Sequence, residues 1–235
     1  MQSGKPSLPP ANGLLLVDKP AGMTSHDVVD HIRRRFRMRR VGHGGTLDPA
    51  ATGLLILLLG RATSHARFLL NADKTYHSTL RLGQTTDTQD GEGKILQTRE
   101  VPPLTRDQIE AVCSRFRGEI EQEVPAYSAV RIQGKRFYDL ARAGKEVPHR
   151  VRRVTVRELK ILELHLPEVD LEVTCSSGTY IRTLCADIGA ALGCGGHLSR
   201  LCRMQVGPFS LRHSVKLEQI GPEHLKPVEE LMAAR

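Results

Sequence analysis

The sequence predicts an α+β fold in which a mixed, largely antiparallel sheet is flanked by helices. Segments with the two-residue alternation of strands and segments with the 3.6-residue repeat of helices both occur along the chain. They lack the regular strand–helix–strand order that is typical of a parallel α/β sheet. With 235 residues, the chain is long enough to bury the core of one large domain.

The N-terminal third predicts a buried strand, a basic helix and a second buried apolar segment. Residues 13–17 are apolar and end in a turn rich in Pro and Gly. Thr24 and Asp27 have the spacing of a capping box, which predicts the start of a helix. The apolar stripe of this helix consists of Val28, Ile32 and Phe36. Residues 54–59 are apolar without interruption, and we expect them to be buried.

The rest of the chain continues with strands and helices in irregular order. The predicted strands cover residues 75–82, 151–164, 170–175 and 201–206. One predicted helix begins after Thr105 and stops at Gly118. A second begins at Thr179 and stops at Gly193. Residues 84–93 are polar and form a predicted loop, which lacks the ligand pattern of a calcium site.

The positive charge of the chain predicts a polyanionic partner. Its formal net charge is +8, and much of it is clustered in two runs, Arg33–Arg40 and His149–Arg153. A protein of this kind is suited to nucleic acid. For either run alone, a solvated surface is the alternative interpretation.

Cysteine usage and hydropathy indicate a cytoplasmic protein without a structural metal. The five cysteines form no C-x-x-C pair, which argues against a zinc finger and a disulfide framework. The longest uninterrupted apolar run, Leu54–Leu59, is six residues long and too short to cross a bilayer. The first twelve residues are polar and lack the apolar core of a signal peptide.

Asp48 stands out because it is the single carboxylate in a glycine-rich loop, Val41–Gly53, that follows the first basic run. Glycines let the backbone approach another molecule closely. A structural alternative is that Asp48 caps a helix, with Pro49 at its first position. A phosphate-binding loop is disfavoured, since no Gly-Lys-Ser/Thr follows the glycines.

Three residues elsewhere suggest a binding site for a base. Tyr76 begins a predicted strand and can stack on a base, although a half-buried strand tyrosine is the simpler interpretation. Tyr180 and Arg182 lie in the first turn of a predicted helix, where a cation opposes the helix dipole. An anion should therefore accompany Arg182, and Asp48 is the natural candidate. Arg182 bound to phosphate is the alternative.

Several segments together resemble the TruB family of tRNA pseudouridine synthases, which isomerise the uridine at position 55 in the T-loop. The resemblance runs in order from about Gly13 to Phe209. Its main motifs are Asp18–Ser25, Gly42–Pro49 and Gly178–Arg182, supported by Asp73–Tyr76, Arg81–Thr88, Tyr127–Ala129 and Leu192–Gly195. It implies the pseudouridine synthase fold and an enzyme that acts on RNA.

The resemblance also implies roles for individual residues. Asp48 is the implied catalytic aspartate, and Arg182 is expected to pair with it. Tyr76 is expected to stack on the flipped uracil and to help remove the C5 proton. Other implied substrate contacts come from His43, which would help displace the nucleotide, and from Tyr180 and Leu201, which would line the pocket.

The same resemblance sets expectations for organisation and partners. Residues 13–213 would form the catalytic domain, between a disordered tail at 1–12 and a short C-terminal tail at 214–235 without a complete PUA domain. The substrate would be the T-arm of tRNA. We expect a monomer that needs no obligate protein partner, no membrane, no cofactor and no metal.

Two residues depart from the usual pattern of the family. Gly44 stands where the family usually has Thr, which would loosen the loop, and Cys202 stands where Arg is frequent.

Two other functions are compatible with parts of the sequence. An RNA-binding protein that catalyses no reaction would use the same basic runs, but it has no need for Asp48. Pseudouridine formation on another RNA is the third possibility.

Overall fold

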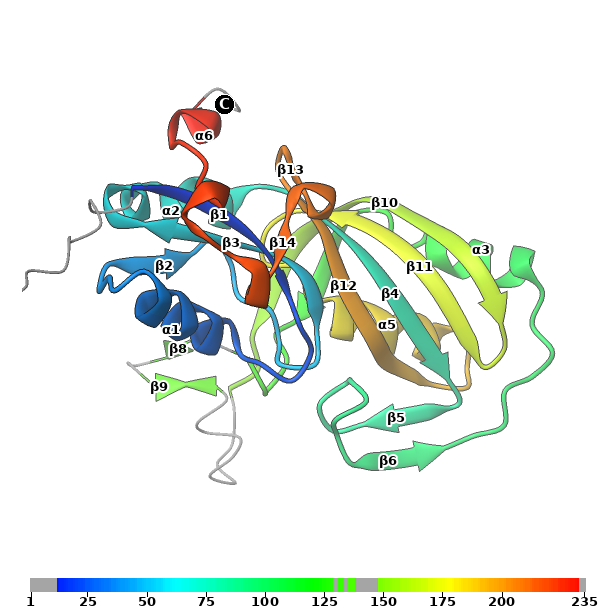
Figure 1. Ribbon diagram of the computed structural model, residues 1–235. Helices are drawn as coiled ribbons and strands as arrows, with labels where there is room; N and C mark the ends of the chain where they lie inside the picture. Colours follow the sequence, from blue (N-terminus) through cyan, green and yellow to red (C-terminus); the bar gives the residue numbers. More distant parts are fainter. Residues whose placement is uncertain (1–11, 129–130, 133–134, 138–147, 233–235) are drawn as a thin grey trace, which may run out of the picture. The chain divides into compact units, whose positions relative to one another are not determined.

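Figure 1 shows the computed structural model of the chain, which describes residues 12–128, 131–132, 135–137 and 148–232. Apart from Asn12, the predicted N-terminal tail lies outside these residues. The chain forms two compact units. The first unit contains the residues up to Ala72 and those from Cys202 onward, and the second unit is Asp73–Leu201. Both combine helices with mostly antiparallel strands, so the predicted α+β class is confirmed.

The central strand of the first unit is β3 (Thr52–Leu59). One edge of β3 pairs antiparallel with β1 (Gly13–Lys19) along its whole length. The other edge pairs with β2 (Val41–His43) at one end and, in parallel, with Cys202 and Arg203 of β12 (Gly196–Val206) at the other. Leu54–Leu59 are at most 1% exposed. Because neighbours cover both edges and both faces, this strand needs apolar side chains at every position.

Helix α1 (Ser25–Arg35) has the N-terminus that the sequence predicts. The Thr24 side chain accepts a hydrogen bond from the backbone N–H of Asp27, whose carboxylate accepts one from the backbone N–H of Thr24. This reciprocal pair satisfies donors that a helix start otherwise leaves unpaired. The predicted apolar stripe of α1 is buried.

The C-terminal part of the chain completes the first unit. Strand β14 (Val215–Lys216) pairs parallel with β1, and β13 (Phe209–Ser210) pairs antiparallel with β12. Leu14 and Lys226 exchange two backbone hydrogen bonds of 2.8 and 2.9 Å. The remaining segments of this unit are helical: η1 (Gly60–His65), α2 (Ala66–Asn71), η2 (Leu211–His213), η3 (Leu217–Gln219), η4 (Pro222–His224) and α6 (Glu229–Met232).

The second unit is built on antiparallel strands. They lie in the order β4 (Lys74–Leu82), β11 (Glu168–Cys175), β10 (Val151–His165) and β7 (Gly118–Glu123). The N-terminal half of β12 borders the free edge of β4, where the Ser199 hydroxyl donates to the carbonyl of Thr79. The strands predicted at 75–82, 151–164 and 170–175 are confirmed within one to two residues.

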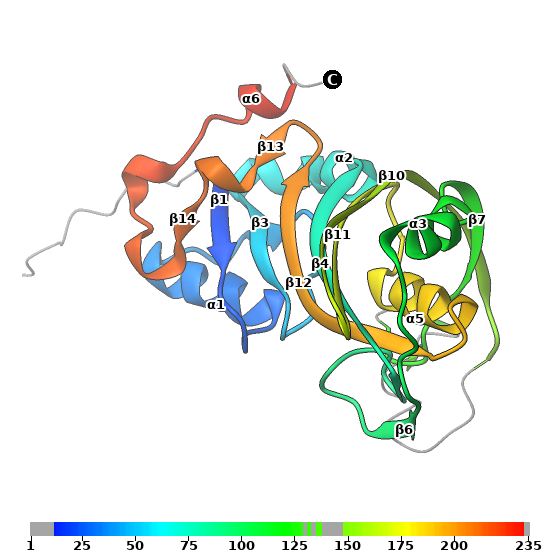
Figure 2. The same cartoon turned by 90° about the vertical axis from the view of Figure 1, so that its right-hand side faces the viewer.

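Two helices, α3 (Arg106–Ser114) and α5 (Ile181–Ala191), cover one face of these strands, as Figure 2 shows. Their buried side chains join those of β4, β10 and β11 in one apolar cluster. Two small hairpins complete the unit: β5 (Gln84–Thr86) with β6 (Ile95–Thr98), and β8 (Arg131–Ile132) with β9 (Lys135–Arg136).

Some predicted boundaries are wrong. Helix α5 begins at Ile181 rather than at Thr179, whose hydroxyl donates instead to the carbonyl of Ser176. The polar segment predicted as a loop starts with strand β5, because its backbone pairs with β6. The last predicted strand begins at Gly196, five residues earlier than the apolar pattern indicates. These differences arise from tertiary pairing that local sequence does not encode.

Replacing Gly189 by Ala should destabilise the protein, although the same change in an exposed helix position is usually stabilising. A Cβ at Gly189 would lie 2.6 Å from the carbonyl carbon of Gly195, and Gly195 donates a 2.9 Å hydrogen bond to the Gly189 carbonyl. Helix propensity favours Ala by up to about 1 kcal/mol, which backbone overlap should outweigh. Urea unfolding of Gly189→Ala would measure the change, and a higher midpoint than wild type would contradict this close packing.

Candidate active site

The loop that carries Asp48 contains no helix. Pro49 to Ala51 form a turn closed by a 3.1 Å hydrogen bond from the Ala51 N–H to the Asp48 carbonyl, and β3 begins at Thr52. The alternative in which Asp48 caps a helix is therefore wrong, because Thr52 and Gly53 pair with β12 and β1 in the sheet. Asp48 is half-buried. Its position on this loop thus needs another explanation than helix capping.

The Asp48 loop, residues 44–51, is fixed on its N-terminal side by Arg203. This guanidinium is 2% exposed and donates to three backbone carbonyls. Its Nε donates to Leu54 at 2.8 Å, and its terminal nitrogens donate to Thr46 and Gly45 at 3.2 and 3.1 Å. Such a rigid, planar donor fixes three acceptors at once.

Ser25 and Lys19 hold the loop on either side of Asp48. The Ser25 hydroxyl accepts from the Leu47 N–H at 2.8 Å and donates to the Leu47 carbonyl at 3.1 Å. The Lys19 ammonium is fully buried and donates to the Pro49 carbonyl at 3.1 Å. Its further acceptors are the carbonyls of Pro20 and Met23. Backbone groups directly before and after Asp48 are therefore both held by buried side chains.

Gly44 has a steric role in this loop. A Cβ at this position would lie 2.6 Å from Cδ1 and 2.7 Å from Cβ of Leu69, a buried residue of α2. The N–H of Gly44 donates to the Ile56 carbonyl at 2.8 Å. A threonine here would require Leu69 to move. The glycine thus allows Leu69 to pack closely against the loop. The sequence-based expectation of a looser loop did not include this contact.

His43 lies at the start of the same loop with a neutral imidazole. Burial lowers its pKa from 6.5, and the positive charges of Arg203 and His26 lower it further. The Gly45 N–H donates to Nδ1 of His43 at 3.3 Å, which favours the tautomer with the proton on Nε2. His43 can therefore act as a hydrogen-bond donor without carrying charge.

In the second unit, Gln122 holds the start of α5. Its side-chain amide accepts from the N–H of Tyr180 at 3.0 Å and donates to the Tyr180 carbonyl at 3.2 Å. Gln122 is 1% exposed. Tyr180 is the N-cap residue of α5, and no side chain caps this helix. Gln122 thus takes the place of a cap and fixes the backbone from which the Tyr180 ring extends.

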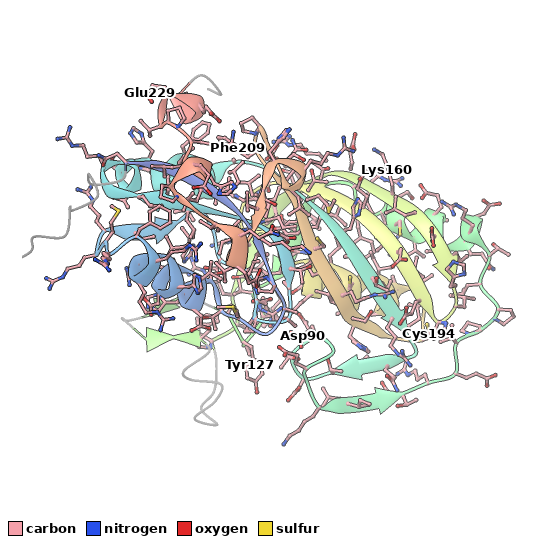
Figure 3. The ribbon with its side chains drawn as sticks, in the orientation of Figure 1. Asp90, Tyr127, Lys160, Cys194, Phe209 and Glu229 are labelled. Atoms are coloured by element: carbon pink, nitrogen blue, oxygen red, sulfur yellow. The ribbon has the colours of Figure 1, made fainter. Side chains whose placement is uncertain are left out.

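Arg182 follows in the first turn of α5 and is 6% exposed. Its terminal nitrogens donate to the carbonyls of Thr88 and Tyr127 at 3.0 and 2.9 Å. One of them lies 3.5 Å from the Asp90 carboxylate. Figure 3 labels Asp90 and Tyr127, which lie near each other as this shared contact requires. The negative charge of Asp90 offsets the unfavourable interaction between the Arg182 cation and the dipole of α5.

Sequence reasoning missed Asp90. It considered this residue only as part of a calcium loop, and Arg182 and Thr88 are 94 residues apart in sequence. Asp48 and Arg182 belong to different units, so their pairing stays a prediction.

The other predicted site residues of the second unit are also half-buried. Tyr76 lies on β4 opposite Val173 of β11. Both Tyr76 and Leu201 of β12 pack against the apolar cluster that contains Ile181. The second unit therefore brings Tyr76, Leu201 and the first turn of α5 to one core, while His43 and Asp48 share the loop of the first unit.

The described residues contain no group of three or more His, Cys, Asp or Glu side chains that could hold a metal ion. Among them, no helix is both long enough and apolar enough to cross a membrane.

Comparison with known proteins identifies the family. A family model described as "TruB family pseudouridylate synthase (N terminal domain)" matches residues 33–181. The chain belongs to the TruB family. A second model, "tRNA pseudouridylate synthase B C-terminal domain", matches residues 182–233. The predicted family and enzyme class, a tRNA pseudouridine synthase and thus an isomerase, are confirmed.

Curated TruB relatives are similar over most of this chain. tRNA pseudouridine synthase B of Syntrophotalea carbinolica is 48% identical over 209 residues, which are 89% of this chain and 68% of the relative. The enzyme of Chromohalobacter salexigens is 49% identical, with 85% of this chain and 65% of the relative covered. That of Opitutus terrae is 44% identical, with 93% and 90% covered.

Solved structures support the pseudouridine synthase fold. A chain in a Cbf5–Nop10–Gar1 complex has a TM-score of 0.74 and 30% identity, covering 95% of this chain and 62% of that one. A chain of an H/ACA RNP bound to a substrate RNA containing 2′-deoxyuridine has a TM-score of 0.71 and 26% identity, covering 99% and 68%. The predicted fold is thus confirmed.

Acidification should destabilise the protein through His43. Because its folded pKa lies below 6.5, the neutral ring contributes stability that is fully present above pH 6.5 and is lost as the pH falls through the folded pKa. Urea unfolding between pH 5 and 8 should therefore show a smaller loss for His43→Gln than for wild type. Equal losses in both proteins would contradict a half-buried, neutral His43.

Proposed function

We propose that this protein isomerises the uridine at position 55 in the T-loop of tRNA to pseudouridine, with Asp48 as catalytic residue and without a cofactor. One observation carries the proposal: Asp48 lies on a loop that Arg203, Ser25 and Lys19 hold, and it caps no helix. The relatives named tRNA pseudouridine synthase B, at 44–49% identity, support the substrate class.

The reaction is an isomerisation whose atoms balance within the nucleotide. The N1–C1′ bond breaks and its electron pair remains on the uracil. Positive charge then develops at C1′, where an ionised carboxylate can stabilise it, attack it or accept the C2′ proton. The uracil turns, C5 bonds to C1′, the proton of C5 is lost and N1 gains one. The detached base must be kept from water throughout.

A base inside a folded RNA has to leave its stack to reach such a carboxylate. In this proposal, Tyr76 stacks on the flipped uracil and helps to remove the C5 proton, while Tyr180 and Leu201 line its pocket. Aromatic stacking of this kind contributes about 1–3 kcal/mol per base. The neutral His43 donates to the displaced region of the T-loop.

Arg182 pairs with the catalytic carboxylate in the proposed site. A guanidinium that is already fixed by Asp90 and by two carbonyls loses little freedom when it binds an additional oxygen. It therefore suits the task of orienting Asp48 by charge-assisted hydrogen bonds.

The T-arm of tRNA is the proposed partner, and a cytoplasmic monomer without an obligate protein partner is the proposed state. The Cbf5–Nop10–Gar1 complex and the H/ACA RNP contain structural neighbours at 30% and 26% identity. The tRNA pseudouridine synthases are more similar in sequence. This difference favours tRNA over the substrate RNA of an H/ACA RNP.

Tritium release from C5 of uridine tests the proposal. An in vitro transcribed tRNA with tritiated uridine is incubated with wild type, Asp48→Asn or Asp107→Asn, without added cofactor. Wild type should release about one tritium per tRNA from the T-loop, and Asp48→Asn should release none while still binding the tRNA. Asp107 is exposed in the first turn of α3, so Asp107→Asn is the matched control and should keep full activity.

Two outcomes would overturn the proposal. If wild type binds the tRNA but releases no tritium, an RNA-binding function without chemistry replaces it. If Asp48→Asn releases tritium as fast as Asp107→Asn, another residue performs the chemistry.

A further inference from the structure

Six arginines of the first unit lie near one another and have no acidic partner among the residues that the structure describes. They are Arg34, Arg35, Arg37, Arg39, Arg40 and Arg61, and we call them the arginine surface. All six are exposed. Among the residues that the structure describes, none of the six forms an ion pair with a carboxylate. The nearby Asp30 is instead bound to Arg33 at 3.0 Å and lies 3.6 Å from His26.

Backbone contacts bring these arginines together. Arg34 and Arg35 end α1, and Arg37–Arg40 connect α1 to β2, which contacts α1 (Figure 1). The carbonyl of Arg40 accepts from the N–H of Gly60 at 2.9 Å, and its Nε donates to the Thr63 hydroxyl at 2.7 Å. Arg61 lies between these two contacts in η1. The six arginines therefore lie on adjoining segments of the first unit.

The backbone conformation of Arg37 indicates that its side chain has a function. Its φ is 51°, in the left-handed region that disfavours residues with a Cβ. Arg37 donates to the carbonyl of Arg34 and Met38 donates to that of Arg33, which together form a Schellman motif. Glycine is the usual residue at this position of the motif. An arginine here reduces stability, so an observed outlier of this kind suggests a functional reason.

Helix stabilisation explains only part of the surface. Cations in the last turn of a helix interact favourably with its dipole, which accounts for Arg34 and Arg35. The effect falls off beyond that turn. Arg37, Arg39 and Arg61 lie outside it.

The chemistry of the surface fits the phosphate backbone of RNA. Guanidinium groups bind phosphate through paired hydrogen bonds, and closely spaced phosphates match closely spaced arginines. The single aromatic residue within residues 34–40, Phe36, is 9% exposed and belongs to the core. This segment therefore offers no aromatic ring on which an unpaired base could stack, which favours a base-paired stem, where phosphates are the accessible groups.

We propose that the arginine surface binds the phosphates of a base-paired stem of the tRNA substrate. This inference rests on the proposed function for the identity of the RNA. Its contacts carry no sequence information, and they add affinity and fix how the tRNA is oriented on the first unit.

Binding measured against salt concentration tests the proposal. Fluorescence anisotropy with labelled tRNA compares the triple variant Arg35→Gln, Arg37→Gln, Arg39→Gln with the control Arg115→Gln, Arg212→Gln, Lys216→Gln. The control residues are exposed, and both variants lower the net charge by three, from +8 to +5. Loss of three phosphate contacts should weaken binding at least about tenfold near 0.1 M salt and reduce the slope of log Kd against log salt by about two or more.

Competition identifies the bound feature. An RNA hairpin with a long stem should displace labelled tRNA from wild type more effectively than single-stranded polyuridine at equal phosphate concentration. Equal loss of tRNA affinity in both triple variants would overturn the proposal in favour of a general charge effect. The proposal would also be overturned if the Arg35, Arg37 and Arg39 triple variant lost binding to vesicles with anionic lipids while its tRNA binding stayed unchanged. The arginine surface would then bind a membrane.

Arg37→Gly separates function from structure. It should raise the thermal unfolding midpoint, because glycine adopts the left-handed conformation without a Cβ clash, and it should weaken tRNA binding several-fold. An unchanged affinity for tRNA would contradict the proposed role of Arg37. Tritium release by wild type together with equal binding by both triple variants would leave the proposed function standing while this inference fails. If wild type binds tRNA tightly, the arginine triple variant binds it weakly and no tritium is released, the arginine surface binds RNA but the proposed function fails.

Discussion

The backbone of the Asp48 loop depends on hydrogen bonds from three buried side chains. Ser25 and Lys19 donate to the carbonyls of Leu47 and Pro49 on either side of Asp48. Arg203, from a distant part of the sequence, donates to those of Gly45 and Thr46. Buried carbonyls without such donors would cost about 1–3 kcal/mol each. The two buried cations in turn need these acceptors, because an unpaired charge inside a protein is unfavourable. Loop and cations therefore stabilise each other, which holds the backbone around Asp48 without regular secondary structure.

The second unit uses the same principle at the start of α5. Gln122 fixes the backbone of Tyr180, and Asp90 with two carbonyls fixes the guanidinium of Arg182. In both units, buried polar side chains act on backbone groups and thereby orient neighbouring side chains. Catalytic groups need such positioning because small displacements from the reactive geometry reduce rates strongly. Asp48 and Arg182, the two charged groups of the proposed chemistry, each lie on a segment that such a network holds.

Local patterns predicted what local interactions determine. The capping box of Thr24 and Asp27 and the apolar strand Leu54–Leu59 could be read directly, because adjacent residues specify them. The same reasoning failed at Asp48 and Pro49, whose sequence favours a helix start, because the residues that follow pair with β1 and β12 and form a strand. Asp90 could not be found, since no local signal indicates a partner more than ninety residues away. The roles that the resemblance gives to Asp48 and Arg182 stay predictions, and the buried donors beside these residues became visible only in the structure.

Hydrogen exchange of the wild-type protein tests this account most directly. The Leu47 N–H donates to the buried hydroxyl of Ser25, and the Gly44 N–H donates to Ile56 of β3. If the loop is held as described, peptides covering residues 44–51 should exchange nearly as slowly as those of β3, although they contain no helix or strand. Exchange of these amides at the rate of an unstructured peptide would show that the buried side chains do not fix the loop.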